Sequence, residues 1–316
     1  MLTTLTRTLS HNPVARAESE HLARRHAANG TGCRFIVSAA VFGVLGITGL
    51  IFLERGSVLE VIDKVFTYYV VAMLSIVAVI AHFSALVHIS SMAGESVLRE
   101  KRGATWDSLV LTGMDARQVI VGKWWAVVKS CWQRVAIATT IRMVATLMVS
   151  VLILNSSFGL FPQEADPVAA MPLKGAVGVA LVIPFMLLNM LFTAAAGVTA
   201  SVLSGRDTLH GMAGALAARL AMLVSAILLL LIPTAYISLV VVSGPNDDSP
   251  VLVFIAGWLL TMLDNGSIVA ASVANPYDAH TVPYLLSACA SLLTYAGFTV
   301  LMLKIGTMAA RRQGAA

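Results

Sequence analysis

Residues 65–89 read VFTYYVVAMLSIVAVIAHFSALVHI, an apolar run without a single Asp, Glu, Lys or Arg. Its length matches the roughly 20 apolar residues that a helix needs to cross a bilayer. A charged segment, 92–123, follows it, and a second long apolar run begins at residue 135. The alternation of long apolar runs with short polar segments predicts an all-α, polytopic membrane protein.

The composition of the whole chain supports a membrane protein. Hydrophobic residues make up 58% of it and charged residues only 12%, whereas soluble domains carry about a quarter charged residues. The net charge of +5 would suit nucleic acid, but the basic residues stand at the ends of apolar runs and not on a polar face with aromatics. Nucleic-acid binding is therefore not expected. The three cysteines lie far apart and form no disulfide or metal motif.

Six apolar runs are long enough to span a bilayer. They are residues 35–53, 65–89, 135–158, 176–203, 220–242 and 284–304. A seventh run, 251–274, is interrupted by Asp264, Asn265 and Gly266, which form a strong turn signal. We therefore expect about six transmembrane helices and, within 243–283, a re-entrant helical hairpin on the outer side.

Lysine and arginine indicate the orientation, because short cytoplasmic loops are enriched in both. The basic regions are the N-terminal segment 1–34, segment 92–123, the loop with Arg206 and Arg219, and the tail with Arg311 and Arg312. The intervening loops are acidic, and 243–283 contains no Lys or Arg. This pattern predicts that both termini lie in the cytoplasm.

The chain divides into a cytoplasmic N-terminal segment, 1–34, and a single transmembrane domain, 35–316. Asn12 and Pro13 suit the cap and first residue of a helix, so we expect an interfacial helix within 1–34. In segment 92–123, Thr112 and Gly113 suit a helix end, and Asp115 with Gln118 forms a capping box. A short helix at 105–111 would stop there, and a second would run through Lys123 into the third span.

Segment 92–123 resembles the cytoplasmic signature of type-2 ABC exporter permeases. The residues that carry the resemblance are Glu100, Arg102, Gly103, Thr105, Asp107, Leu109, Leu111, Thr112, Gly122 and Lys123. Ala104 separates Gly103 from Thr105, which are usually adjacent in that family, and Gly113 stands where the family often has Pro. The resemblance implies that the segment forms a coupling helix that docks on an ATP-binding-cassette subunit through Glu100, Arg102, Thr105, Asp107, Leu109, Leu111 and Thr112.

The same resemblance implies an exporter permease that moves an unidentified substrate across a bacterial plasma membrane. Its partners would be the ATP-binding-cassette subunit, a second copy or paralogue of the permease, and membrane lipid; homodimer and heterodimer fit equally. The chain itself has no GxxxxGK[ST] phosphate loop, since Lys123 is followed by Trp124. We therefore expect no catalytic, cofactor or metal residues in this chain, with ATP and magnesium bound by the partner subunit.

Arg142 stands inside the third run, where a charge is costly and usually functional or paired. It is a candidate pathway residue for an anionic substrate, although snorkelling towards the cytoplasmic interface also explains it. His82 and His88 do not share a helix face and are assigned no chemistry.

Two alternative functions stay open. One is a secondary transporter, for which mid-span ionisable residues and inverted repeats are not evident. The other is a membrane-embedded enzyme, for which the outer Asp264, Asn265 and His280 are the only polar cluster.

Overall fold

The computed structural model describes residues 12–28, 59–103, 114–155, 171–204, 213–221, 254–255, 258 and 281–313. Its main helices are α2 (Pro13–Ala28), α4 (Leu59–Arg102), α6 (Ala116–Asn155), α7 (Met171–Leu203) and α11 (Thr281–Arg312). Residues 213–221 form a shorter helix, and the described residues contain no strand. The predicted all-α class and the helix expected within 1–34 are confirmed.

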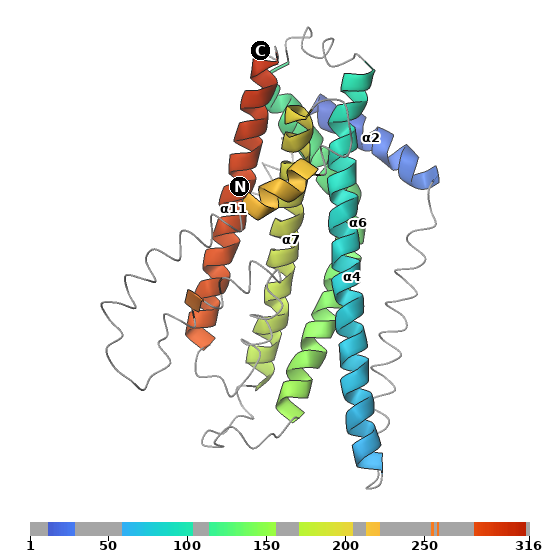
Figure 1. Cartoon of the computed structure of the whole chain (residues 1–316), viewed down its shortest axis with the longest axis vertical. Coiled ribbons are helices and arrows are strands. Elements are labelled where there is room, and N and C mark those ends of the chain that lie inside the picture. The colour runs from blue at the N-terminus through green and yellow to red at the C-terminus, as the bar shows by residue number, and fades with distance from the viewer. Residues whose placement is uncertain are drawn as a thin grey trace, which may run out of the picture.

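Four long helices, α4, α6, α7 and α11, form a bundle, and α2 lies across one end of it (Figure 1). Three of them, α4, α7 and α11, run towards that end, and α6 runs away from it. We call this end, drawn at the top of Figure 1, the charged end. It comprises α2 and residues 95–103, 114–130, 199–204 and 306–313.

The surface and length of the helices are those of a membrane protein. Three helical segments are long and apolar enough to cross a bilayer: Val70–Arg102, Ala176–Leu203 and Val282–Arg312. Large apolar side chains face outwards from them, for example Phe83 on α4 at 60% exposure, as expected for a surface that contacts lipid tails. They correspond to three of the six predicted spans.

The other three predicted spans are not among the three candidate spans. In α6, the helix that contains the third predicted span, Arg134 and Arg142 interrupt the apolar sequence, and α6 is not among the three candidate spans. Run 35–53 lies outside the described residues, as do nearly all of 220–242 and 251–274. The number of spans and the re-entrant hairpin therefore stay predictions.

Two helix boundaries show how segment 92–123 is built. Helix α4 does not end with the apolar run but continues as one helix to Arg102, because Glu, Leu, Arg and Lys are all good helix formers. Its last turn carries Arg99, Lys101 and Arg102, whose positive charges suit a helix C-terminus. Helix α6 begins at Ala116 and runs without a break through Lys123, so the predicted continuation into the third run is confirmed.

Small residues bring α4 and α7 into close contact. Gly197 and its neighbours Ala194, Ala195 and Ala196 are buried. A Cβ atom added at Gly197 would lie only 2.7 Å from the Cβ of Ala93 on α4, which is far inside van der Waals contact. The missing side chain therefore sets the distance between the two helices, as small residues do in membrane bundles.

Candidate functional site

The helix α2 is fixed to the start of α6 by its cap. The Asn12 side-chain oxygen accepts hydrogen bonds from the backbone N–H of Val14 at 3.0 Å and of Ala15 at 3.4 Å, as an N-cap does. The Asn12 amide nitrogen donates to the carbonyl of Gln118 on α6 at 2.9 Å. Val14 and Leu22 are buried in the core cluster shared with α4, α6 and α7. A single cap therefore starts α2 and also attaches it to the bundle.

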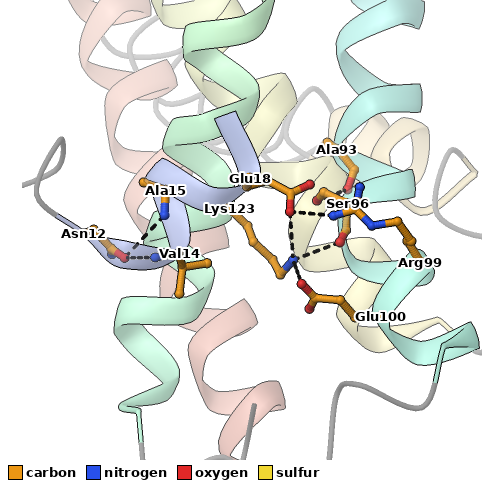
Figure 2. Close-up of polar contacts among 9 residues, drawn as sticks. All are labelled: Asn12, Val14, Ala15, Glu18, Ala93, Ser96, Arg99, Glu100 and Lys123. Atoms are coloured by element: carbon orange, nitrogen blue, oxygen red, sulfur yellow. Dashed lines mark hydrogen bonds and ion pairs between the residues drawn. The ribbon is translucent and has the colours of Figure 1, made fainter. Parts of the chain in front are cut away.

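Four charged side chains lie where α2, α4 and α6 contact one another. We call them the charged network: Glu18, Arg99, Glu100 and Lys123. Figure 2 shows the Glu18 carboxylate of α2 turned towards Arg99 of α4 and Lys123 of α6. Arg99 donates to it at 2.7 Å, and the Lys123 ammonium lies 3.8 Å away. Lys123 also donates to Glu100 at 2.6 Å and to the carbonyl of Ser96 at 2.9 Å.

Burial decides how much the charged network contributes to the fold. Lys123 has 0% of its surface exposed and Glu18 has 4%. A buried charge is tolerated only when it is paired and hydrogen-bonded, and the network pairs two carboxylates with two cations. Removing one member of a buried pair leaves the other charge uncompensated, which costs about 3–5 kcal/mol. The network therefore locks the ends of α2, α4 and α6 into one arrangement.

A second set of contacts attaches α4 to the end of α7. The Lys101 ammonium donates to the carbonyls of Ser201 at 3.2 Å, Val202 at 2.7 Å and Ser204 at 3.0 Å. The Gln313 side chain, beyond α11, donates to the carbonyl of Val202 at 2.9 Å. The last carbonyls of a helix have no partner within it, so Lys101 satisfies the end of α7 and fixes it to α4.

Asp115 begins α6 and confirms half of the predicted capping box. Its carboxylate accepts from the N–H of Arg117 at 3.1 Å, which is the bond of an N-cap, and it lies 3.5 Å from the guanidinium of Arg311. The reciprocal bond from the Gln118 side chain is not formed among the described residues. The backbone carbonyl of Gln118 accepts from the Asn12 side chain, which is a separate contact between α6 and the start of α2.

The predicted partner-binding residues fall at the end of α4 and in segment 104–113, which follows it in the sequence. Glu100 and Arg102 lie in the last turn of α4. The others, Thr105, Asp107, Leu109, Leu111 and Thr112, lie outside the described residues. Arg102 is exposed. Glu100 instead forms an ion pair with the buried Lys123, and its side chain is only 14% exposed. The sequence pattern identified both Glu100 and Lys123 but not that they bind each other.

A second polar group, which we call the mid-bundle cluster, lies outside the charged end. Its members are His82, Arg142, Asn189, Thr193 and Arg219. The Asn189 amide nitrogen lies 3.2 Å from Nε2 of His82. A terminal nitrogen of Arg219 donates to the side-chain oxygen of Asn189 and, at 2.8 Å, to the hydroxyl of Thr193.

Arg142 adds a further positive charge to this cluster. It is 5% exposed, which does not fit a side chain that snorkels along the outside of the bundle, and it lies close enough to act electrostatically on His82. Sequence reasoning missed the cluster because its members come from α4, α6, α7 and 213–221, and only Asn189 and Thr193 share a helix. The available signal was that three of the apolar runs contain a strongly polar side chain, namely His82, Arg142 and Asn189.

The described part of the chain contains no group of three or more His, Cys, Asp or Glu that would hold a metal ion. Comparison with protein-family models, with curated proteins and with solved structures finds no match to this chain. The function is therefore inferred from the charged end, the mid-bundle cluster and the sequence pattern of segment 92–123.

Proposed function

We propose that this chain is the membrane permease subunit of an ATP-driven ABC exporter. In this proposal the chain has six spans, an outer re-entrant hairpin within 243–283 and both termini in the cytoplasm of a bacterial cell. Segment 1–34 provides the interfacial helix, and 92–123 is the coupling segment. A separate ATP-binding-cassette subunit binds ATP and magnesium, and a second permease copy or paralogue completes the transporter. This chain is not itself an enzyme.

The charged network is the observation that supports the proposal most strongly. It joins α2, the end of α4 and the start of α6 on both sides of segment 104–113, where the coupling helix is expected. A displacement of segment 104–113 would move α4 and α6 only if the ends of these two helices were held rigidly. Buried ion pairs such as Lys123–Glu100, together with the Lys101 cap on α7, provide such attachments.

The resemblance in segment 92–123 supplies the identity of the partner. In the proposed mechanism, ATP-driven closure of the partner subunits moves the coupling helix and shifts the permease between inward-facing and outward-facing states. Asp107, Leu109 and Leu111 are the contacts expected with the partner. Arg102, which is exposed at the end of α4, would extend the same contact surface.

Co-purification from the native membrane tests the proposal. The wild type should retain an ATP-binding-cassette subunit in mild detergent, and Asp107→Lys should lose most of it because a charge on the docking surface is reversed. Glu100 is unsuitable for this test, since its reversal would also disrupt the charged network. Arg312→Glu, an exposed charge at the same end, is the matched control and should retain the partner.

Two results would contradict the exporter proposal. One is a stable wild-type protein that brings down no ATP-binding-cassette subunit, and the other is Asp107→Lys retaining it as well as the wild type does. Thermal unfolding of each variant in the same detergent separates a lost contact from a lost fold.

A second candidate is an ATP-independent secondary transporter. The mid-bundle cluster favours it, because ionisable residues inside a membrane commonly mark substrate or ion pathways. His82, Arg142 and Arg219 form such a group, which the sequence alone did not reveal. The co-purification experiment discriminates the two candidates, since a secondary transporter needs no ATP-binding partner.

A further inference from the structure

The five main helices form two units that are fastened in different ways. Helices α2, α4 and α6 are joined by the charged network, whose central cation, Lys123, is buried. Helices α7 and α11 are joined by a hydrogen bond from the Thr199 hydroxyl to the carbonyl of Met302 at 2.8 Å and by the edge-to-face contact of Phe192 with Tyr295. We call these two sets of helices the network unit and the α7–α11 unit.

The inner contact between the two units is a close packing of small residues. Gly197 on α7 lies against α4, where an added Cβ would be only 2.7 Å from that of Ala93. The Trp124 indole on α6 also donates to the carbonyl of Leu191 on α7 at 3.0 Å. Ala93 lies eight residues before Lys101 on α4, which is about 12 Å along the helix. These contacts therefore provide a pivot nearer the middle of the bundle.

The outer contact is what we call the Lys101 clasp, formed by the Lys101 ammonium and the carbonyls of Ser201, Val202 and Ser204. The three bonds measure 3.2, 2.7 and 3.0 Å. Lys101 and Ser204 are both only partly buried. Because water as well as a side chain can satisfy the last carbonyls of a helix, the clasp can open without leaving a buried charge unpaired.

The other polar contacts at the charged end differ from the clasp. Lys123 and Glu18 in the network unit are buried, and separating them from their partners would leave a charge unpaired in the protein interior. Arg311 of α11 and Asp115 of α6 have side chains that are 59% and 45% exposed, and an exposed ion pair contributes little. Opening of the charged end is therefore easiest between the two units, and the Lys101 clasp is the contact that opposes it.

We infer that the Lys101 clasp is a latch that closes the charged end of the bundle. While the clasp is formed, α7 follows α4; when it is released, the α7–α11 unit turns away from the network unit about the Gly197–Ala93 contact. The latch deepens the proposed function and rests on it for its trigger. Segment 104–113 begins three residues after Lys101, so a partner that displaces this segment acts on the clasp first.

Distances between spin labels test the latch in the purified chain, without any partner. Glu20→Cys on α2 and Met308→Cys on α11 are labelled together in a chain whose three native cysteines are replaced by serine. Both positions are exposed, and α2 and the end of α11 lie on opposite sides of the charged end (Figure 1). Lys101→Met keeps the length of the side chain and removes its donors. We expect it to add a longer-distance population, with the ratio of open to closed molecules at least about tenfold higher than with Lys101 in place.

Three controls accompany this measurement. Lys101→Arg keeps the charge and the donors and should preserve the original distances. Lys304→Met removes an exposed lysine of α11 and should also leave them unchanged. A second label pair, Glu20→Cys with Lys129→Cys on α6, lies within the network unit and should keep its distance in Lys101→Met. That constant distance distinguishes opening between the units from a general loss of structure.

The inference is overturned if Lys101→Met leaves the distances between the units unchanged, if Lys101→Arg or Lys304→Met opens the bundle as much, or if the pair within the network unit lengthens equally. Should Lys101→Met not fold, Lys101→Gln takes its place, because its amide is uncharged and shorter but still polar. The labelled chain contains no partner, so failure of the latch leaves co-purification of an ATP-binding-cassette subunit unaffected. Failed co-purification likewise leaves the distances to decide on the latch.

Discussion

Lys123 is the residue on which the charged end depends most, because its ammonium has no exposed surface and contacts Glu100, Glu18 and the carbonyl of Ser96. Replacing it by methionine keeps the length of the side chain and removes the charge. Glu18 and Glu100 then lose the buried ammonium that lies beside both carboxylates. We expect Lys123→Met to lower the free energy of unfolding by about 3–5 kcal/mol, measured by chemical denaturation in detergent.

The matched control for Lys123→Met is Lys129→Met on the same helix. Lys129 is exposed, and a surface substitution of this kind usually changes stability by no more than about 0.5 kcal/mol. If the two variants are equally stable, the charged network does not hold the three helices together.

At the scale of elements, the contact between α4 and α7 is set by one missing side chain. Gly197→Ala would place a Cβ 2.7 Å from that of Ala93, and overpacking of this kind costs about 1–3 kcal/mol. We expect Gly197→Ala to lower the thermal unfolding temperature and Ala93→Gly to restore it in the double variant. Recovery in the double variant would show that the two Cβ atoms are what clash.

Gly297 on α11 provides the opposite case. A Cβ added there meets nothing within 4 Å, and alanine is favoured over glycine in a helix by up to about 1 kcal/mol. Gly297→Ala should therefore be neutral or stabilising in the same measurement. If Gly197→Ala and Gly297→Ala lower the thermal unfolding temperature equally, a general intolerance of alanine explains the effect, and the α4–α7 contact does not.

The cap of α2 gives a local prediction. Asn12→Ala removes the two bonds to the start of α2 and the bond to Gln118, and loss of an N-cap costs about 1 kcal/mol. Hydrogen exchange should become faster in the amides of α2 while the amides of α7 keep their protection. Uniformly faster exchange throughout the bundle would indicate that α2 does not open as a separate unit.

At the scale of the whole molecule, the proposed topology places both ends of the chain on the same side of the membrane. In a chain with its cysteines replaced by serine, Glu20→Cys and Gln313→Cys should react with a membrane-impermeant maleimide only after the cells are opened. Glu60→Cys, at the start of α4, should react in intact cells because α4 runs away from the outer face. Labelling of Gln313→Cys from outside would mean an odd number of spans.

The sequence determined the elements for reasons that are local. Long apolar runs predict the helices that include residues 65–89, 176–203 and 284–304, in which the single charge is Lys304 at the end of the last run, because a helix satisfies its own backbone in lipid. Asn12 and Asp115 predict where α2 and α6 begin, since a cap acts on residues two or three positions away. The end of α4 was not predicted: good helix formers continue the helix past the apolar run to Arg102, and Gly103 follows directly.

The tertiary structure alone decided which side chains meet. Glu100 and Lys123 were identified as a pattern in one segment, but only the packing of α2 onto α6 brings Glu18 between Lys123 and Arg99. The mid-bundle cluster arises in the same way, because His82, Arg142 and Asn189 come from three different apolar runs and Arg219 comes from residues 213–221. Local chemistry fixes helices and caps, whereas burial and pairing of charges depend on contacts between residues as far apart in sequence as His82 and Asn189.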